Sequence, residues 1–482
     1  MSRGARTAPN KWAVLVAIGL SYFITVVTTS FSVLALRAIA EDFNITLRTV
    51  GWVVIIESLI IAALLLPVGG VSDRVGKHRT LRVGIAVFGL GLILTGLAPT
   101  FPTLIIARVV TALGNTLVQS VSTGILVAAF PPEERGLALG GQTTAVATGA
   151  AAGPLLGGLL LDALDWQLLF LLLAIPTGIT FLVVRRVLDI ETHPPARTTS
   201  FDTRGAILAS SFITVLIFTL NDPFEFGLRS PFALTGVVLG VALLVAFVRT
   251  ELRHERPMLD VRLFQIDDFR RAVALRAIGF VASSSVLILI PVFLLGVLDL
   301  STRATGGILA LFAIGMTLGA QVSGRLYDRL GARLPMTVGI AMQISILLLL
   351  SQVGQDSSLV FVAIGTFGNG LGQGLWNVPA NSVMMGAMPA DSLGVGGAFT
   401  NVTRTIGSVI GQAGATAIVA GVMASQGFDI PLGDVVDTTG AGSAFVDGWR
   451  LTYLIGASVS VLSLLLAVRT SSDSSRSTGG AR

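Results

Sequence analysis

The chain has 482 residues, of which 53% are hydrophobic and 12% are charged, and its mean hydropathy is +0.83. Soluble globular chains carry about 25% charged residues, so this composition excludes an ordinary soluble enzyme and a disordered protein. The formal net charge of +5 comes from basic residues in short loops between apolar runs, which is typical of membrane topology and not of a nucleic-acid-binding face. The chain has no Cys and three widely spaced His residues, so no metal site or cofactor is expected.

A helix that spans a membrane needs about 20 mostly apolar residues. Fourteen such runs follow one another and predict an all-α integral membrane protein. The first run is too long for a cleaved signal peptide, and no typical cleavage site follows it. The predicted spans cover residues 12–36, 50–72, 80–98, 103–129, 137–161, 166–185, 204–221, 231–249, 271–296, 304–324, 334–353, 359–386, 394–422 and 449–468.

The distribution of basic residues predicts the orientation of these spans. With both termini in the cytoplasm, the cytoplasmic segments hold 25 of the 32 Lys and Arg residues. The reverse orientation would place most of the positive charge outside, against the usual bias. We therefore expect a multi-pass protein of the plasma membrane with both termini in the cytoplasm.

Short sequence patterns recur at nearly one offset and indicate an internal repeat. Repeated helix bundles are common in secondary transporters. The recurring patterns are Asp73–Gly76 with 328–331, Gly114–Gln119 with Gly368–Gln373, and Gly140, Gly141 and Thr144 with Gly396, Gly397 and Thr400.

The repeat predicts two similar six-helix halves separated by two additional spans, a 6 + 2 + 6 arrangement. The N-terminal bundle is expected over residues 1–186 and the C-terminal bundle over 271–468. A linker with two additional helices is expected over 187–270, and the polar tail 469–482 is expected to be a disordered cytoplasmic segment.

The loop after the second span, Gly69–Arg79, reads G-G-V-S-D-R-V-G-K-H-R. It resembles the G-x-L-[AS]-D-R-x-G-[RK]-[RK] signature of the major facilitator superfamily, in which this loop acts as a conformational latch. A positive-inside turn would explain the basic residues but not the spacing of Asp and Gly. The resemblance and the repeat imply a latch formed by Gly69, Asp73, Arg74, Gly76, Asp328 and Arg329.

The fifth span contains a glycine pattern, Gly149-x-x-x-Gly153-Pro154-x-x-Gly157, that resembles the antiporter motif of the same superfamily. That motif is associated with exporters. Glycines at i, i+4 and i+8 line one helix face and allow close packing, and the proline is expected to bend the span. Small residues at this spacing are also common in other membrane helices, so close packing alone is the alternative.

The helix count and the Arg404-x-x-Gly407 pattern resemble the fourteen-span drug:proton antiporter branch of the superfamily. That branch often carries an acidic residue in the first span, proposed to bind protons or cationic drugs. This chain has Thr28 at that position. The departure argues against a standard multidrug-cation profile.

Three charged residues lie well inside predicted spans, where charges are costly and mark function by default. Glu57 and Arg108 lie at similar depths in the second and fourth spans. We expect Glu57 to carry a coupling proton and Arg108 to tune its protonation. The alternatives are a permanent structural ion pair and a Glu57 side chain that reaches the outer water. For Arg404 the sequence suggests no acidic residue in the cytoplasmic half of that bundle, so we expect it to bind an anionic group or the carbonyls of a broken helix.

Amide side chains recur at i, i+4 spacing in the fourth and twelfth spans, so each set lines one helix face. We expect these residues to line a substrate cavity, with Trp376 as an aromatic wall. Hydrogen bonding between helices as a packing device is the alternative. The residues are Asn115, Gln119, Asn369, Gln373 and Asn377.

These features predict a proton-coupled exporter of lipophilic small molecules or drugs that works by alternating access. An exporter of lipid or fatty-acid-like amphiphiles is the alternative, favoured by Thr28 and Arg404. The chain is not expected to be an enzyme, because no nucleophile with a base occurs at membrane depth, and it lacks the P-loop of ATP-driven pumps. The expected partners are a small lipophilic substrate, protons and membrane lipid, without nucleic acid, and the chain is expected to be a monomer.

Overall fold

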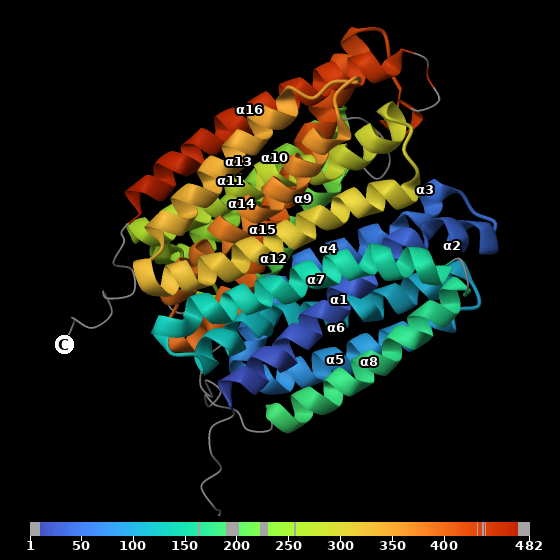
Figure 1. The fold of residues 1–482 in the computed structure, drawn as a ribbon. Coiled ribbons are helices and arrows are strands. Elements are labelled where there is room, and N and C mark those ends of the chain that lie inside the picture. Colours follow the sequence, from blue (N-terminus) through green and yellow to red (C-terminus); the bar gives the residue numbers. More distant parts are fainter. Residues whose placement is uncertain are drawn as a thin grey trace, which may run out of the picture. The chain divides into compact units, whose positions relative to one another are not determined.

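The computed structural model describes residues 10–161, 164–188, 202–221, 230–254, 257–430, 432–435, 438 and 440–470. These residues fold into α-helices joined by short 3-10 segments and one π-helical turn, as Figure 1 shows. Twelve of the helices are long and apolar enough to cross a membrane, which confirms the prediction of an all-helical membrane fold. They are α1 (Lys11–Leu34), α4 (Trp52–Val75), α5 (Lys77–Gly96), α6 (Phe101–Ala129), α8 (Trp166–Val187), α9 (Thr203–Asn221), α10 (Pro231–Arg253), α11 (Asp267–Val292), α12 (Thr302–Leu330), α13 (Arg333–Ser351), α15 (Leu393–Ser425) and α16 (Ala441–Arg469).

Two more long helices coincide with the fifth and twelfth predicted spans but are not among these twelve. They are α7 (Arg135–Leu161), with 27 residues, and α14 (Leu359–Gly386), with 28 residues. The short helices α2 (Leu36–Asp42) and α3 (Leu47–Val50) connect α1 to α4. The fourteen-span arrangement and the predicted bundle boundaries stay predictions.

The chain divides into two compact units. Unit 1 comprises residues 1–210, 250–260 and 388–401, and unit 2 comprises residues 211–249, 261–387 and 402–482. The first turns of α15 therefore belong to unit 1, although that helix lies late in the sequence. The predicted tail from residue 471 onward lies outside the described residues.

Local polar contacts explain where several helices begin. The Asn10 side chain accepts a hydrogen bond from the Trp12 amide at the start of α1 (2.9 Å). At the start of α6, Thr100 and Thr103 form a reciprocal capping box. Such caps satisfy amides of the first turn, which have no partner within the helix.

Unit 1 packs its helices closely through glycines. A methyl group added at Gly114 of α6 would lie 2.3 Å from the Phe88 amide nitrogen of α5. Leu81, Ile85, Val118 and Val121 belong to the apolar core that α5 and α6 share. Because real side chains do not approach backbone so closely, glycine is required for this contact.

Unit 2 has a similar glycine contact between α12 and α14. A methyl group at Gly370 would lie 2.0 Å from the Phe312 carbonyl oxygen, and one at Gly374 would lie 2.5 Å from that of Met316. Elsewhere in this unit, Trp449 of α16 packs against Phe293 with ring centroids 4.6 Å apart. Its indole N–H donates to the Leu350 carbonyl of α13 at 2.7 Å, so this buried ring is both packed and hydrogen-bonded.

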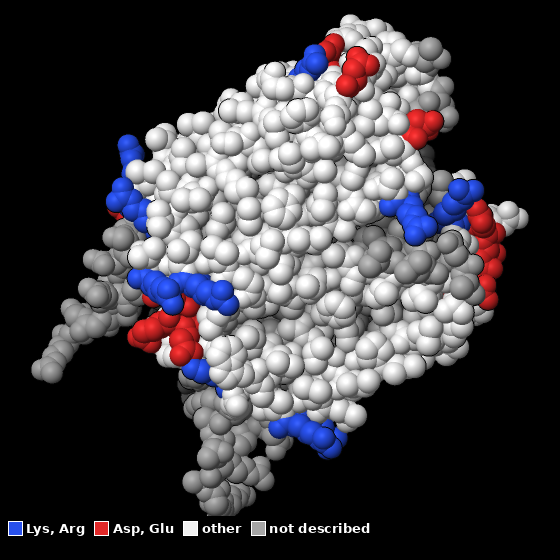
Figure 2. Space-filling view, viewed as in Figure 1, with Lys and Arg blue, Asp and Glu red and all other residues white. Residues whose placement is uncertain are grey.

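The exposed surface of the helices is largely apolar. In the face seen in Figure 2, charged side chains gather near helix ends and uncharged residues cover the helix lengths. Exposed large apolar side chains are frequent along helices such as α10, where Leu234, Val238 and Val241 are more than half exposed. Apolar surface on this scale is unusual for a soluble chain and is consistent with burial in lipid.

Candidate functional site

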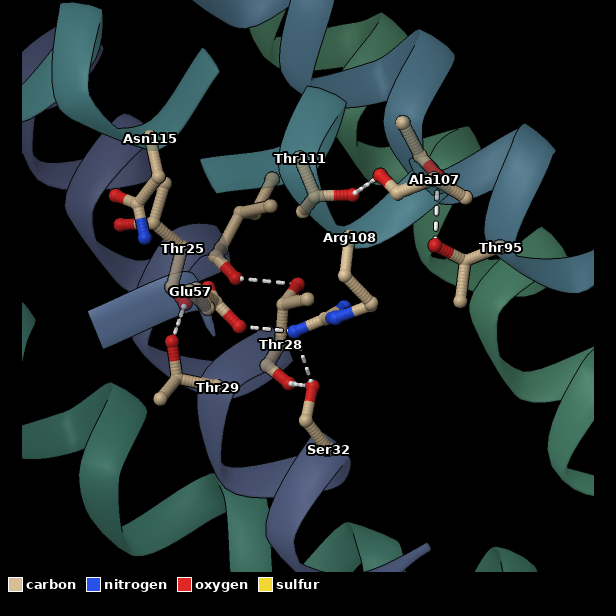
Figure 3. Close-up of polar contacts among 12 residues, drawn as sticks. Thr25, Thr28, Thr29, Ser32, Glu57, Thr95, Ala107, Arg108, Thr111 and Asn115 are labelled. Atoms are coloured by element: carbon tan, nitrogen blue, oxygen red, sulfur yellow. Dashed lines mark hydrogen bonds and ion pairs between the residues drawn. The ribbon is translucent and has the colours of Figure 1, made fainter. Parts of the chain in front are cut away.

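The predicted charges Glu57 and Arg108 meet inside unit 1. Glu57 of α4 is 3% exposed and Arg108 of α6 is fully buried. One guanidinium nitrogen of Arg108, Nη2, donates to Glu57 Oε2 and also to Ser32 Oγ of α1, the latter at 2.8 Å. Figure 3 shows the two side chains pointing toward each other beside Thr28 and Ser32. The pair therefore joins three helices through one guanidinium group.

This pair leaves hydrogen-bonding capacity unused. Glu57 Oε1 and Arg108 Nε and Nη1 are buried, and none of them has a hydrogen-bond partner among the described residues. The Arg108 guanidinium lies over the Phe170 ring of α8, 5.5 Å from its centroid, a favourable cation–π contact. Unsatisfied buried polar atoms are costly, so a proton, water or ligand group at these atoms would stabilise the site.

The face of α1 next to this pair consists of hydroxyl groups. Thr28 donates to the Ile24 carbonyl oxygen at 2.9 Å, and Ser32 donates to the Thr28 carbonyl oxygen at 2.9 Å. Thr28 lies beside Glu57 and Arg108 in Figure 3. The carboxylate that Arg108 binds is therefore that of Glu57 on α4, and α1 contributes hydroxyl groups at this site.

Two of the predicted cavity amides lie further along α6 in the same unit. Asn115 follows Arg108 by seven residues and thus shares its helix face. Gln119 Nε2 donates to Asn115 Oδ1 at 2.9 Å, and Asn401 Nδ2 of α15 donates to the Gln119 carbonyl oxygen at 3.1 Å. Both residues are buried; their side chains bond to each other along α6, and the bond to α15 is made by the Gln119 backbone carbonyl.

The predicted latch residue Asp73 binds the start of α15. Its two carboxylate oxygens accept the amides of Gly394 at 2.8 Å and Val395 at 3.0 Å, and Lys77 lies 2.8 Å from Oδ1. An anionic group is stabilised at a helix N-terminus, where amides have no partner within the helix. A methyl group at Gly69 would lie 2.8 Å from Ala398 Cβ, so this glycine allows the close approach of α4 and α15.

Glycine is required at the turns that follow α4 and α12, within the two predicted latch segments. Gly76 has a φ of +103° and Gly331 a φ of +79°, in the region that other residues rarely adopt. In unit 1, Arg74 is half-buried. In unit 2, Asp328 is half-buried and Arg329 is exposed at the end of α12.

The glycines of the predicted antiporter motif form the contact of α7 with α1. Methyl groups at Gly149, Gly153 and Gly157 would lie 3.0 Å or less from Phe23, Ser30 and Leu34 atoms, respectively. Pro154 belongs to α7, but its side chain lies outside the described part of the chain. The motif therefore brings α7 close to the helix that carries Thr28 and Ser32.

The predicted amides of α14 form a row inside unit 2. Asn369 is fully buried and exchanges hydrogen bonds with Ser283 of α11, at 3.2 and 3.3 Å. Gln373 Oε1 and Asn377 Oδ1 are buried without a hydrogen-bond partner among the described residues, and so is Asn381 Oδ1. Asn381 continues the i, i+4 spacing of the row beyond Asn377.

Trp376 is fully buried between helices of unit 2. Its ring meets Phe280 of α11 edge to face, with centroids 5.1 Å apart, and a methyl group at Gly279 would lie 2.8 Å from it. Its indole Nε1 has no hydrogen-bond partner among the described residues. Arg404, which we expected to bind an anionic group, is half-buried on α15.

Two further charges that hydropathy does not single out are buried in helices that could cross a membrane. Arg276 of α11 is 3% exposed, with its guanidinium 5.4 Å from the Phe280 ring centroid. Glu251 of α10 is 2% exposed. Both lie near an end of an apolar run, so hydropathy places them at a span boundary and does not reveal their burial.

A cavity of about 500 Å³ lies elsewhere in unit 1, at the start of α8. Asp42 of α2 borders it and accepts hydrogen bonds from Trp166 at 3.1 Å and Gln167 at 2.8 Å. None of the predicted site residues lines this cavity. The Glu57–Arg108 pair thus lies outside it, in the packed interior.

These features define a multi-span helical membrane protein with charged and amide side chains in its interior. The chain belongs to the Major Facilitator Superfamily, whose family model matches residues 18–412. It is therefore a membrane transporter.

Relatives of known name agree with this class. The chain is 28% identical to the riboflavin transporter RibZ of Clostridioides difficile over 95% of this chain and 97% of the relative. It is 30% identical to the multidrug resistance protein Stp of Mycobacterium tuberculosis over 83% and 74% of the two chains. The crystal structure of the human organic anion transporter MFSD10 (TETRAN) covers 94% of this chain and 100% of its own, with a TM-score of 0.69 and 14% identity. That last likeness shows the fold alone.

Proposed function

We propose that this transporter exports lipophilic small molecules in exchange for protons, by alternating access in the plasma membrane. The proposal includes fourteen spans in a 6 + 2 + 6 arrangement, with α9 and α10 as the added pair and both termini in the cytoplasm. The similarity to a multidrug resistance protein and the glycine contact of α7 with α1 support export. The single observation that carries proton coupling is the buried Glu57–Arg108 pair.

Protonation of Glu57 would change how three helices are held together. A neutral carboxyl group attracts the Arg108 guanidinium far less than a carboxylate does. Ser32 of α1 would then remain as an acceptor for Arg108, while the attachment of α4 to α6 weakens. The site would thus have two arrangements: one in which Arg108 binds both Glu57 and Ser32, and one in which it binds mainly Ser32. Exchange against a proton gradient requires that protonation shift the equilibrium between two such arrangements.

The same helix, α4, carries both the proposed proton site and the latch. Glu57 and Asp73 are 16 residues apart, about 24 Å along a helix. A shift of α4 at Glu57 would therefore move Asp73 relative to the α15 amides that it binds. This connection supports a latch that responds to the proton.

The interior amides support recognition of the substrate through hydrogen bonds and not through charge. Gln373 and Asn377 offer carbonyl oxygens without partners, next to the indole of Trp376 on the same helix. Asn115 and Gln119 supply similar groups in unit 1, and Arg404 would meet an anionic group where the substrate has one. Such a set suits uncharged aromatic molecules, a class to which the riboflavin of the relative RibZ also belongs.

Export of lipid or fatty-acid-like amphiphiles is the second candidate function. Thr28 favours it, because α1 places a hydroxyl group and no carboxylate beside Arg108. A site without a second negative charge is poorly suited to organic cations.

Everted membrane vesicles with an imposed pH gradient test the proposal. An ethidium-like cation, a neutral aromatic drug and a fatty acid are added in turn to wild type, Glu57→Gln and the matched control Glu41→Gln. We expect the neutral drug to dissipate the gradient in wild type and in the control, whose residue is exposed on α2, but not in Glu57→Gln. Dissipation that survives Glu57→Gln would remove Glu57 from the proton path.

The fatty acid distinguishes the two candidate functions. A response to the fatty acid alone, in excess of that in empty vesicles, would replace the drug proposal with lipid export.

A double variant tests whether the position of the carboxylate matters. Adding Thr28→Asp to Glu57→Gln returns a carboxylate to the neighbourhood of Arg108 from α1. We expect this double variant to recover proton exchange, because the charge and not the helix that carries it defines the site.

A further inference from the structure

Two buried carboxyl groups face each other at one end of the α9–α10 pair, well separated in sequence from Glu57. Asp202 precedes α9 and is 3% exposed, and Glu251 lies in the last turn of α10 and is 2% exposed. All the residues of this site belong to unit 1. Carboxyl groups are almost never so buried unless something compensates their charge.

Each carboxyl group uses one oxygen to hold the backbone. Asp202 Oδ1 accepts the Gly205 amide at 2.8 Å, as an N-cap of α9. Glu251 Oε2 accepts the Leu259 amide at 3.2 Å and so fixes the segment that follows α10. These bonds orient both groups and leave one oxygen of each for another partner.

The two remaining oxygens approach a single point. A Cβ atom built on Gly205 would lie 2.4 Å from Glu251 Oε1 and 2.6 Å from Asp202 Oδ2. Glu251 Oε1 and Asp202 Oδ2 are therefore no more than about 5.0 Å apart. Gly205 has no side chain, and this leaves the space between the two oxygens open. Both oxygens are buried without a hydrogen-bond partner among the described residues.

The charged neighbours of Glu251 add to the cost of its charge. The charged groups that act on Glu251 are Asp202 and Asp260, and both are negative. Two ionised carboxylates at this separation would repel strongly inside the protein. A proton between Oε1 and Oδ2 would remove one charge and supply the hydrogen bond that both oxygens lack.

We propose that Asp202 and Glu251 form a second proton-binding site, a carboxyl pair that shares one proton and ties the start of α9 to the end of α10. The site is independent of the function proposed for Glu57. Ser210 of α9 donates to the Ala63 carbonyl oxygen of α4 at 2.8 Å, so the proton at this pair supports a helix that is bonded to α4. Loss of the proton would loosen this end of the α9–α10 pair.

Infrared difference spectroscopy on the full chain in lipid vesicles detects the shared proton directly. The background variant is Glu57→Gln, so that Glu57 contributes no carboxylic acid signal. We expect a C=O stretch of a protonated carboxylic acid at neutral pH, shifted in D₂O. Asp202→Asn and Glu251→Gln should each abolish it, because an amide N–H then takes the place of the proton while shape and packing are kept.

Controls separate this outcome from a structural one. Glu134→Gln, which alters an ion pair with Lys11, should leave the signal unchanged, and thermal unfolding should show that all variants are folded. A signal that is absent, or that persists in both single variants, would overturn the proposal. So would loss of the signal on addition of sodium, potassium or magnesium ions at constant pH, since the pair would then be a metal-cation site.

Discussion

The interiors of the two units hold different polar chemistry. Unit 1 contains a buried ion pair, Glu57 with Arg108, which bonds three helices to one guanidinium group. Unit 2 contains a row of amides on α14 beside the buried indole of Trp376. An ion pair changes state with one proton, whereas amides do not titrate in the physiological range. In the proposed function the two units would divide two tasks, with proton exchange in unit 1 and substrate hydrogen bonding mainly in unit 2.

Breaking the ion pair should have the largest effect. Arg108→Leu leaves Glu57 buried without a countercharge, so we expect the free energy of unfolding to fall by about 3–5 kcal/mol. The double variant Glu57→Gln/Arg108→Leu should recover most of this loss without recovering proton exchange. Denaturation of the purified chain measures the first effect, and vesicle assays measure the second. Equal stability of Arg108→Leu and wild type would contradict a buried ionised pair.

The glycine contacts should be equally sensitive in both units. Gly153→Ala in α7 and Gly374→Ala in α14 each place a methyl group within 2.5 Å of a packed neighbour. We expect each to destabilise the protein by about 1–3 kcal/mol. Gly178→Ala is the matched control, because nothing lies within 4 Å of its added methyl group, and it should be neutral or gain up to about 1 kcal/mol. A tolerated Gly153→Ala would mean that α7 and α1 are not held in this contact.

Neutralising Asp73, the proposed latch residue, should have a smaller effect on stability. Asp73→Asn removes the anionic acceptor that binds two α15 amides, and we expect a loss of about 1 kcal/mol together with slower transport. Thermal unfolding and initial transport rates measure these effects. The control Asp267→Asn alters an exposed carboxylate of α11 and should change neither. A variant with unchanged transport would show that the latch does not limit the cycle.

Altering the row of amides on α14 should change the affinity for substrate and leave proton exchange unchanged. Gln373→Leu removes one acceptor that is free for a substrate, so we expect KM to rise about fivefold, which corresponds to about 1 kcal/mol. The proton response at saturating substrate should stay the same. Competition assays with a neutral aromatic drug measure the shift. A loss of proton exchange in this variant would break the division of tasks between the two units.

Much of the fold and part of the candidate site followed from the sequence. Hydropathy places the long helices, because lipid requires continuous apolar runs. The depth of Glu57 and Arg108 within their runs correctly suggested that they meet. The Asp and Gly spacing of the latch pointed to a helix N-terminus and a tight turn, where Asp73 and Gly76 now lie.

Other features depend on which helix faces pack together. Hydropathy and motif spacing in a single sequence do not predict these contacts. Trp376 is buried, and its contacts are with Phe280 and Gly279 of α11, a helix almost 100 residues away in sequence. Arg276 and Glu251 lie near the ends of apolar runs, where hydropathy does not distinguish a buried charge from one at the membrane surface. The partner of Asp73 is more than 320 residues away in sequence, so only the folded chain reveals it.

The hydroxyl groups of α1 affect how easily that helix bends. Thr28, Thr29, Ser30 and Ser32 each donate to the carbonyl oxygen four residues earlier. Such bonds compete with the backbone ladder and often bend a helix slightly. Because a hydroxyl group can rotate to another acceptor, this bend can vary, unlike one imposed by proline. The segment of α1 that contacts both Arg108 and α7 can therefore change its bend, and we expect its amide hydrogen exchange to be faster than that of equally buried helix segments without such bonds.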